Sequence, residues 1–251
     1  MWPKVFDPRQ AAMKAVAAAR SAVGEALRGA TLYGSAVGGE FQLEHSDVNV
    51  AFVFSRLGAP ELLSLSRAHR AWERCRVVRP LLLSEDTLRS SLDTFPLEYL
   101  LIRERRETLY GEDFFGPLTL DGNALRLEVE RVLRAQELGL AWSYVALAGT
   151  RSGARNWASA ASTSIAASAA GLLYLAGEPI PARRRDLAER CASRFAVDSA
   201  ALERLLTLRR GDRRAGMDAN DLLDSAQRIL NRLLETAERL SAPSPNHRGG
   251  G

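Results

Sequence analysis

Residues 30–54 read ATLYGSAVGGEFQLEHSDVNVAFVF, and this stretch decides the fold of the first half of the chain. A short apolar strand over Thr31–Tyr33 is predicted to end at Gly34–Ser35, where a glycine-rich turn begins. The later run Val48–Phe54 is apolar and rich in valine and phenylalanine, which is typical of a central strand buried on both faces. The stretch therefore predicts two core strands joined by a turn and a polar segment.

Elements on either side of this stretch alternate between helix and strand. Asp7 or Pro8 is a suitable start for a helix that is predicted to run to about Leu27, with Gly29 ending it. After the central strand the pattern predicts, in chain order, a helix over 60–74, a strand over 76–83, a helix over 85–92, a strand over 95–103 and a short strand over 108–111. This alternation predicts an α/β domain.

The character of the sequence changes after Pro117. Helical periodicity runs from Asn123 almost to Ala242, and no valine- or isoleucine-rich run remains. The periodicity is broken at 149–153, 177–181, 196–198 and 211–216. We therefore expect an α/β domain over 1–120, an all-α helical bundle over 121–242 and a disordered tail over 243–251.

The sharpest motif is Gly34-Ser35 followed by Ser46-Asp47-Val48-Asn49 at the start of an apolar strand. This pattern resembles the core signature of the DNA polymerase beta-type nucleotidyltransferase superfamily, whose minimal bacterial members carry a C-terminal helical domain. The resemblance covers roughly the first half of the chain and is sharp only over 32–54. The later stretch Leu109–Asp113 is also similar to a segment often found in small bacterial nucleotidyltransferases. The alternative is an ordinary strand–turn–strand unit in which Asp47 caps a turn.

The resemblance implies a mixed sheet, a nucleoside triphosphate (NTP) as substrate and Mg²⁺ as cofactor. Gly34 and Ser35 would hold the triphosphate, because a glycine lets phosphate oxygens approach backbone N–H groups and a serine adds a hydroxyl donor. Asp47 would be a catalytic residue that binds metal, and Asn49 occupies the position of the second metal-binding acid. Residues at i and i+2 of a strand point to the same face, so both can reach one metal site.

Asn49 departs from the family pattern, which has a carboxylate there. An amide oxygen can still bind Mg²⁺, but it brings no negative charge to the metal cluster. The sequence therefore predicts a weakened metal site.

The family also uses a third acid on a later strand, which helps to activate the acceptor. Glu98 is the only acidic residue inside the strand predicted over 95–103, so it is the candidate catalytic base. Asp93 and Glu104 flank that segment and are the alternatives.

Two functions from different classes follow from this pattern. One is an enzyme that transfers a nucleoside monophosphate from an NTP to a protein, an RNA or a small hydroxyl compound. The other is a catalytically inactive protein of the same fold that binds a nucleotide or a partner, and Asn49 is the feature that favours it.

The chain carries a formal net charge of +4, which favours an anionic partner only weakly. The strongest basic clusters are Arg183–Arg185 and Arg209–Arg210 with Arg213–Arg214. They are suited to bind RNA phosphates, and the alternative is that they lie on solvated helix ends.

Cys75 and Cys191 are far apart in the chain and form no metal-binding motif, so two reduced, buried thiols in a cytoplasmic protein are expected. The segment Ala158–Ala176 has no charge and approaches the length of a transmembrane helix, but alanine and serine dominate it. We therefore predict a helix buried in a soluble bundle and no membrane partner. An alanine-rich helical surface would also suit a homodimer.

Overall fold

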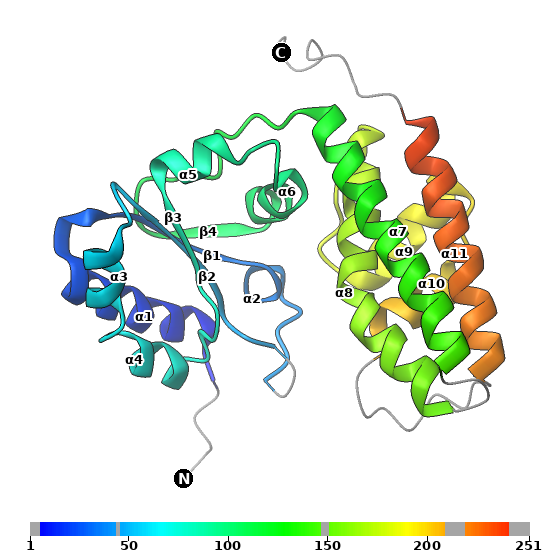
Figure 1. The fold of residues 1–251 in the computed structure, drawn as a ribbon, viewed down its shortest axis with the longest axis horizontal. Helices are drawn as coiled ribbons and strands as arrows, with labels where there is room; N and C mark the ends of the chain where they lie inside the picture. Colours follow the sequence, from blue (N-terminus) through cyan, green and yellow to red (C-terminus); the bar gives the residue numbers. More distant parts are fainter. Residues whose placement is uncertain (1–5, 44–45, 147–150, 209–218, 241–251) are drawn as a thin grey trace. The chain divides into compact units, whose positions relative to one another are not determined.

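The computed structural model describes residues 6–43, 46–146, 151–208 and 219–240. The chain forms two compact units (Figure 1). The first comprises the described residues of Met1–Asp93 and Tyr99–Thr119, and the second those of Thr94–Glu98 and Leu120–Gly251. The tail over 243–251 lies outside the described residues.

The first unit contains a mixed four-stranded sheet with the order β3-β2-β1-β4. Its strands are β1 (Leu27–Tyr33), β2 (Asn49–Phe54), β3 (Leu81–Ser84) and β4 (Arg106–Gly111). Strand β1 runs antiparallel to both β2 and β4, whereas β2 and β3 are parallel. The expected α/β class is therefore confirmed, and β2 is the central buried strand that its apolar run predicted.

Three helices cover one side of this sheet: α1 (Pro8–Val23), α3 (Ala59–Leu65) and α4 (His69–Arg74) (Figure 1). Alanines on α1 are fully buried and let the helix approach the sheet closely, while Trp72 on α4 stacks on Phe52 with ring centroids 5.4 Å apart. The Trp72 indole also donates a 3.0 Å hydrogen bond to the Ala15 carbonyl. These contacts fix α1 and α4 against β2, so the strand that begins at Asn49 has a rigid support.

The first helix is shorter and β1 is longer than the sequence predicted. Helix α1 ends at Val23, and Gly24 follows it with φ +57°. Gly29, which was expected to end this helix, lies inside β1 instead. A Cβ atom at Gly29 would lie 2.7 Å from the Glu112 carbonyl oxygen, so this glycine serves a close approach between β1 and the segment after β4.

The segments after β2 are also more broken than predicted. The helix expected over 60–74 is two short helices, α3 and α4, and the strand expected over 76–83 is reduced to β3. The short helix over 85–92 is confirmed as α5 (Glu85–Ser90), and the strand over 108–111 is confirmed within β4.

The strand predicted over 95–103 is wrong, because this segment is helix α6 (Pro96–Glu104). A proline is well suited to the first turn of a helix, where its missing N–H has no intrahelical partner. Leu97, Leu100 and Ile102 are buried, and short apolar segments of this kind fit a helix and a strand almost equally well.

The second unit is a helical bundle, as expected. Its helices are α7 (Gly122–Ala146), α8 (Arg151–Leu175), α9 (Arg184–Phe195), α10 (Ser199–Thr207) and α11 (Ala219–Arg239). Within the described residues one segment, Asn156–Leu175, has the length and mean hydropathy (1.3) to cross a membrane, and 61% of it is buried inside the protein. Such burial is typical of a core helix in a bundle.

Both cysteines are free and buried, as predicted. Burial raises the pKa of the Cys191 thiol to about 12. The thiol is therefore a packing group rather than a nucleophile.

Candidate functional site

The candidate site is built around Gly34, where β1 ends. This residue has φ +77° and ψ −141°, a conformation that is essentially restricted to glycine. Its N–H donates to the Arg105 carbonyl oxygen at 3.1 Å, which ties the turn to the start of β4. The one-turn helix α2 (Ser35–Gly38) follows directly.

Asn49, the first residue of β2, lies directly against this glycine. It pairs with Tyr33 across the β1–β2 ladder, one residue before the turn. Its Nδ2 atom lies 3.1 Å from the position that a Cβ atom at Gly34 would occupy. A side chain at Gly34 would therefore crowd the Asn49 amide, which would have to shift slightly.

The strand register defines the face on which this amide lies. Tyr33 is opposite Asn49 on one side and Arg106 on the other, so these three residues share one face of the sheet. The neighbouring residues Leu32 and Val50 point to the other face, where they join the core beneath α1. Asn49 consequently faces away from that core.

Asp47 lies two residues before Asn49, just outside β2, and is exposed. Its neighbour Val48 is buried, and the Val48 N–H donates to the Arg76 carbonyl oxygen at 3.0 Å. The chain is thereby anchored immediately after Asp47. Within the described part of the chain, the Asp47 carboxylate makes no hydrogen bond or ion pair.

Other aspartates of this protein behave differently, because they accept hydrogen bonds from backbone N–H groups at turns and helix starts. These aspartates are Asp7, Asp113, Asp121 and Asp198. Asp47 makes no such bond, so the described structure does not support a turn-capping role for it. Ser35 and Asn49 likewise make no side-chain hydrogen bond within the described residues, so the hydrogen-bonding capacity of all three polar side chains is unused there.

The donor atoms at this site fit a hard cation in type. The Asp47 carboxylate and the Asn49 amide oxygen are both ligands that Mg²⁺ accepts, although together they bring a single negative charge. Within the described residues no group of three His, Cys, Asp or Glu side chains is placed to hold a metal ion.

Glu98 does not lie on a strand, in contrast to the prediction, because it is in the first turn of α6. It belongs with the residues of the helical unit, whereas Asp47 and Asn49 belong to the sheet unit. The residue is exposed, and desolvation by the surrounding chain still raises the pKa of its carboxyl group. Its assignment as the catalytic base remains a prediction.

The two alternative candidates for the catalytic base, Asp93 and Glu104, lie just before α6 and at its end. Asp93 lies in the turn before α6, and Glu104 ends that helix in an ion pair with Arg103 at 2.9 Å. The acidic residue within β4 is Glu107, which pairs with Leu32 and contacts Arg9 on α1 at 2.5 Å. Glu107 therefore lies on the face of the sheet opposite to Asn49.

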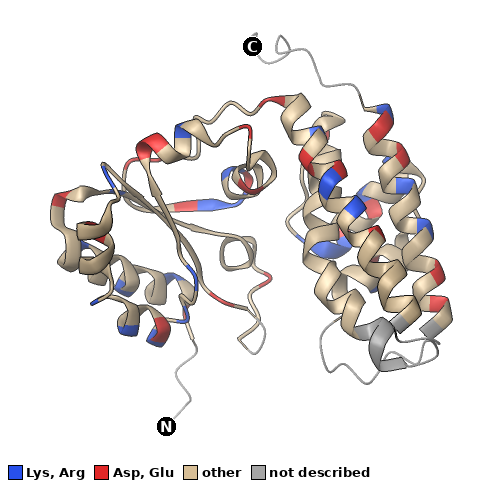
Figure 2. Ribbon diagram, in the orientation of Figure 1, with Lys and Arg blue, Asp and Glu red and all other residues tan. Residues whose placement is uncertain are grey.

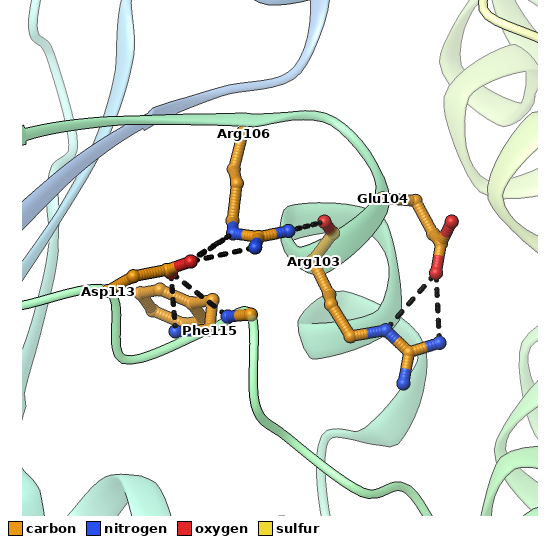
Figure 3. Close-up of polar contacts among 6 residues, drawn as sticks. Arg103, Glu104, Arg106, Asp113 and Phe115 are labelled. Atoms are coloured by element: carbon orange, nitrogen blue, oxygen red, sulfur yellow. Dashed lines mark hydrogen bonds and ion pairs between the residues drawn. The ribbon is translucent and has the colours of Figure 1, made fainter. Parts of the chain in front are cut away.

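The segment Leu109–Asp113 has a structural role that its sequence did not reveal. Asp113 accepts hydrogen bonds from the Arg106 guanidinium at 2.7–3.1 Å and from the backbone N–H groups of Phe115 and Gly116 (Figure 3). Arg106 also donates to the Arg103 carbonyl oxygen at the end of α6. The hydrogen bonds from Arg106 and from the two N–H groups lower the pKa of the Asp113 carboxyl group. These hydrogen bonds hold the loop after β4 in place.

The basic cluster Arg183–Arg185 lies at the start of α9, and two of its three side chains have partners within the helical unit. Arg185 forms an ion pair with Glu189 at 3.0 Å, and Arg184 donates to the Leu206 carbonyl oxygen. The second cluster, Arg209–Arg210 and Arg213–Arg214, lies outside the described residues.

Two arginines near the site were not predicted from the sequence. Arg105 contacts Gly34 through its carbonyl oxygen, and Arg76 contacts the residues on either side of Asp47, because its guanidinium donates to the Ser46 carbonyl oxygen at 3.4 Å. Neither contact has a local sequence signal, since each depends on how distant segments pair. Figure 2 shows that β1 and β2 carry few charges, so the charged residues at the strand ends set the electrostatics here.

In comparisons with known proteins, no family model and no curated protein matches this chain. Its function is therefore inferred from the geometry of its own residues.

Proposed function

We propose that the N-terminal unit has a nucleotidyltransferase fold and transfers a nucleoside monophosphate from an NTP to a hydroxyl acceptor, with a weakened metal site. The observation that carries this proposal is the contact between Gly34 and Asn49, with the exposed Asp47 carboxylate two residues away. It joins the two halves of the sequence motif where β1 ends and β2 begins, at one end of the two inner strands and on the face away from the α1 core.

Each residue of the candidate site has a role in the proposed reaction. The open backbone at Gly34 would accept the triphosphate, and the Ser35 hydroxyl would donate to a phosphate oxygen. Asp47 and the Asn49 oxygen would hold Mg²⁺, which supplies charge neutralisation at the phosphate when it is bound. The single negative charge of this donor pair predicts weak metal binding and slow turnover.

The test is transfer of label from an α-³²P-NTP to protein, RNA or small hydroxyl compounds in the presence of Mg²⁺. Asp47→Ala should abolish transfer, because it removes the one carboxylate of the proposed metal-binding pair. Asp86→Ala is the matched control, since it removes a carboxylate from the same unit whose side chain is 94% exposed. Full transfer by the Asp47 variant would refute the assignment.

A second candidate function is nucleotide or partner binding without catalysis, and Asn49 is the observation that favours it. Asn49→Asp restores the second carboxylate and separates the two cases. Increased NMP transfer would mean that the native site is a weakened enzyme. Unchanged, undetectable transfer together with NTP binding would favour the inactive binding protein.

A further inference from the structure

The segment 66–79 carries the whole formal net charge of the chain. It holds five arginines and one acidic residue, Glu73, so its formal charge is +4. The net charge of the full sequence is also +4, so the remaining basic and acidic residues are equal in number and cancel. Positive charge is therefore concentrated on α4 and in the segment after it, and Figure 2 shows basic residues along this helix.

The outer face of these helical turns carries a row of exposed arginines, the arginine row, which consists of Arg67, Arg70 and Arg74. Each of them follows a buried residue by two positions, which is about 200° further round a helix. The buried residues are Leu65, Ala68 and Trp72. The row therefore points away from the core, and it is about 10 Å long because a helix rises about 1.5 Å per residue.

The charges of the arginine row are not balanced by neighbouring carboxylates. Within the described residues its side chains, and that of the exposed Arg79, make no ion pair or hydrogen bond. Glu73 lies 3.6 Å from His69 instead. Other exposed arginines of the same unit do have carboxylate partners, since Arg56 and Arg89 each pair with a glutamate, at 2.9 and 2.8 Å. An unbalanced row of cations favours a polyanionic partner.

The apolar side of α4 is already used within the protein. Trp72 is 4% exposed and stacks on Phe52, so it is not available to stack on a base or to enter a lipid surface. It is the only Phe, Tyr or Trp of segment 66–79. Single-stranded nucleic acids are usually held by stacking aromatics as well as by charge, whereas duplex RNA is held mainly through its phosphates and 2′-hydroxyls. A row of about 10 Å spans about three phosphates of one strand.

The C-terminal end of the arginine row lies close to the candidate site. Arg76, two residues after Arg74, donates from its guanidinium to the Ser46 carbonyl oxygen at 3.4 Å. Its own carbonyl oxygen accepts the Val48 N–H at 3.0 Å. Asp47 lies between these two contacts. A polyanion bound along the row would therefore approach the segment that carries the proposed metal-binding carboxylate.

We infer that the arginine row, extended by Arg79, is a surface that binds the phosphate backbone of double-stranded RNA. RNA is the polyanion among the acceptor classes of the proposed transfer, so this surface also names RNA as the acceptor. The choice of acceptor rests on the proposed function, whereas RNA binding by the row does not require transfer.

The experiment measures the binding of a short fluorescent RNA duplex of mixed sequence to the full chain by anisotropy, without NTP or Mg²⁺, between about 50 and 200 mM salt. The logarithm of the association constant should fall with the logarithm of salt concentration with a slope of about −3 to −4, because each phosphate contact contributes about −0.9.

Replacement of the arginine row by three alanines should weaken binding about tenfold or more at the lower salt and reduce the slope to about −1. Replacement by three lysines keeps the charges and should keep most of the affinity, since lysine also binds phosphate as a point charge. Glu73→Gln should tighten binding, because it removes the one acidic side chain of the segment.

The matched control replaces three arginines of the same unit that pair with glutamates, Arg28, Arg56 and Arg89, by alanine. It changes the net charge by the same amount, and its RNA affinity should stay within about twofold of the parent. The melting temperature of each variant separates lost binding from lost folding. The triple-alanine variant of the row should melt like the parent, because its side chains are exposed.

The outcomes separate this surface from the proposed function. Equal affinity and slope in the parent and the triple-alanine variant overturn the surface and leave nucleotidyl transfer untouched. RNA binding that depends on the row, without any transfer of label, supports the surface and counts against the enzyme. Tighter binding of a DNA duplex or of single-stranded RNA than of the RNA duplex overturns the choice of duplex RNA.

Anionic vesicles are the last comparison, because Leu62 and Leu63 on α3 are exposed. Binding to phosphatidylserine-containing vesicles that depends on the row, without RNA binding, would overturn the assignment in favour of a membrane.

Discussion

At the scale of single residues, Gly34 combines a backbone conformation that disfavours other residues with a tight approach of the Asn49 amide to its Cβ position. Gly34→Ala places a Cβ atom 3.1 Å from the Asn49 Nδ2 atom and forces alanine to φ +77°. We expect the free energy of unfolding to fall by about 1–3 kcal/mol and nucleotide binding to be lost. Chemical denaturation and calorimetry measure the two effects.

Gly39→Ala is the control for this change. Gly39 also has positive φ, +74°, but nothing lies within 4 Å of its Cβ position. The control should lose stability and keep the Asn49 amide in place, so its nucleotide affinity should stay close to that of the parent. Equal affinity in Gly34→Ala and the parent would contradict the proposed role of the contact.

Arg76 also has a positive φ near the site and, unlike a glycine, is strained by it. It has φ +61° at the position after the α4 C-cap, where glycine is the common residue, and its buried Nε atom has no hydrogen-bond partner in the described chain. Arg76→Gly should raise the free energy of unfolding or leave it unchanged, because glycine removes a strain of about 1 kcal/mol. It should also loosen the chain at Ser46 and weaken Mg²⁺-dependent nucleotide binding, as thermal shift measurements would detect.

Ala196→Gly provides the comparison, since Ala196 is the other described non-glycine residue with positive φ, +55°, and it caps α9 in the helical unit. It should relieve the same kind of backbone strain without changing nucleotide binding. If Arg76→Gly and Ala196→Gly bind nucleotide equally well, Arg76 is only a helix-capping residue.

At the scale of elements, the loop after β4 depends on the Asp113 carboxylate. Asp113→Asn removes the charge that organises Arg106 and two backbone N–H groups, so we expect a loss of stability of about 1–3 kcal/mol near neutral pH. The pKa of Asp113 is lowered in the folded state, so its stabilisation is present above the ordinary aspartate pKa of about 3.9 and is lost as the pH falls through the lower folded value.

The measurement is the difference in melting temperature between Asp113→Asn and the parent from pH 7 down to pH 3. The difference should be largest at neutral pH and shrink below about pH 4, because protonation then neutralises the parent as well. Asp86→Asn, at the exposed start of α5, should show a small difference at every pH. A difference for Asp113 that does not change with pH would contradict this account.

Local sequence patterns predicted those elements that need only local information. The apolar run of β2 and the helices of the second unit were identified because their periodicities are unambiguous. Segment 96–104 was misassigned, since nine residues with scattered buried positions fit either period. Gly29 was misread as a helix end because its actual role is a contact with Glu112 from a distant segment.

The contacts of the candidate site also include some that are local in the sequence and some that are not. Neighbouring strands in a hairpin lie side by side, so the approach of Gly34 and Asn49 could be predicted from one short stretch. The positions of Arg105 and Arg76 could not be predicted, because they depend on pairing between segments far apart in the sequence.

At the scale of the whole molecule, the chain crosses between its two units more than once. Residues Thr94–Glu98 belong to the helical unit although most of α6 belongs to the sheet unit. Leu97 explains the assignment, because it is buried and its Cδ1 atom lies 3.0 Å from the Cβ position of Gly171 on α8. The helical unit therefore needs a side chain from before the segment that was predicted to begin it.

Leu97→Ala tests this dependence in the full chain. The cavity should lower the free energy of unfolding of the helical unit by about 2–5 kcal/mol, and amide hydrogen exchange in α7 and α8 should become faster. Leu88→Ala is the corresponding change in the sheet unit, since Leu88 is 2% exposed on α5. This variant should accelerate amide exchange in β2 and β3 instead. Faster exchange throughout the chain in both variants would mean that the two units unfold as one. Separate responses would mean that the sheet keeps its stability when the bundle opens, so a ligand bound at the proposed site beside Gly34 would protect β1 and β2 without protecting α8.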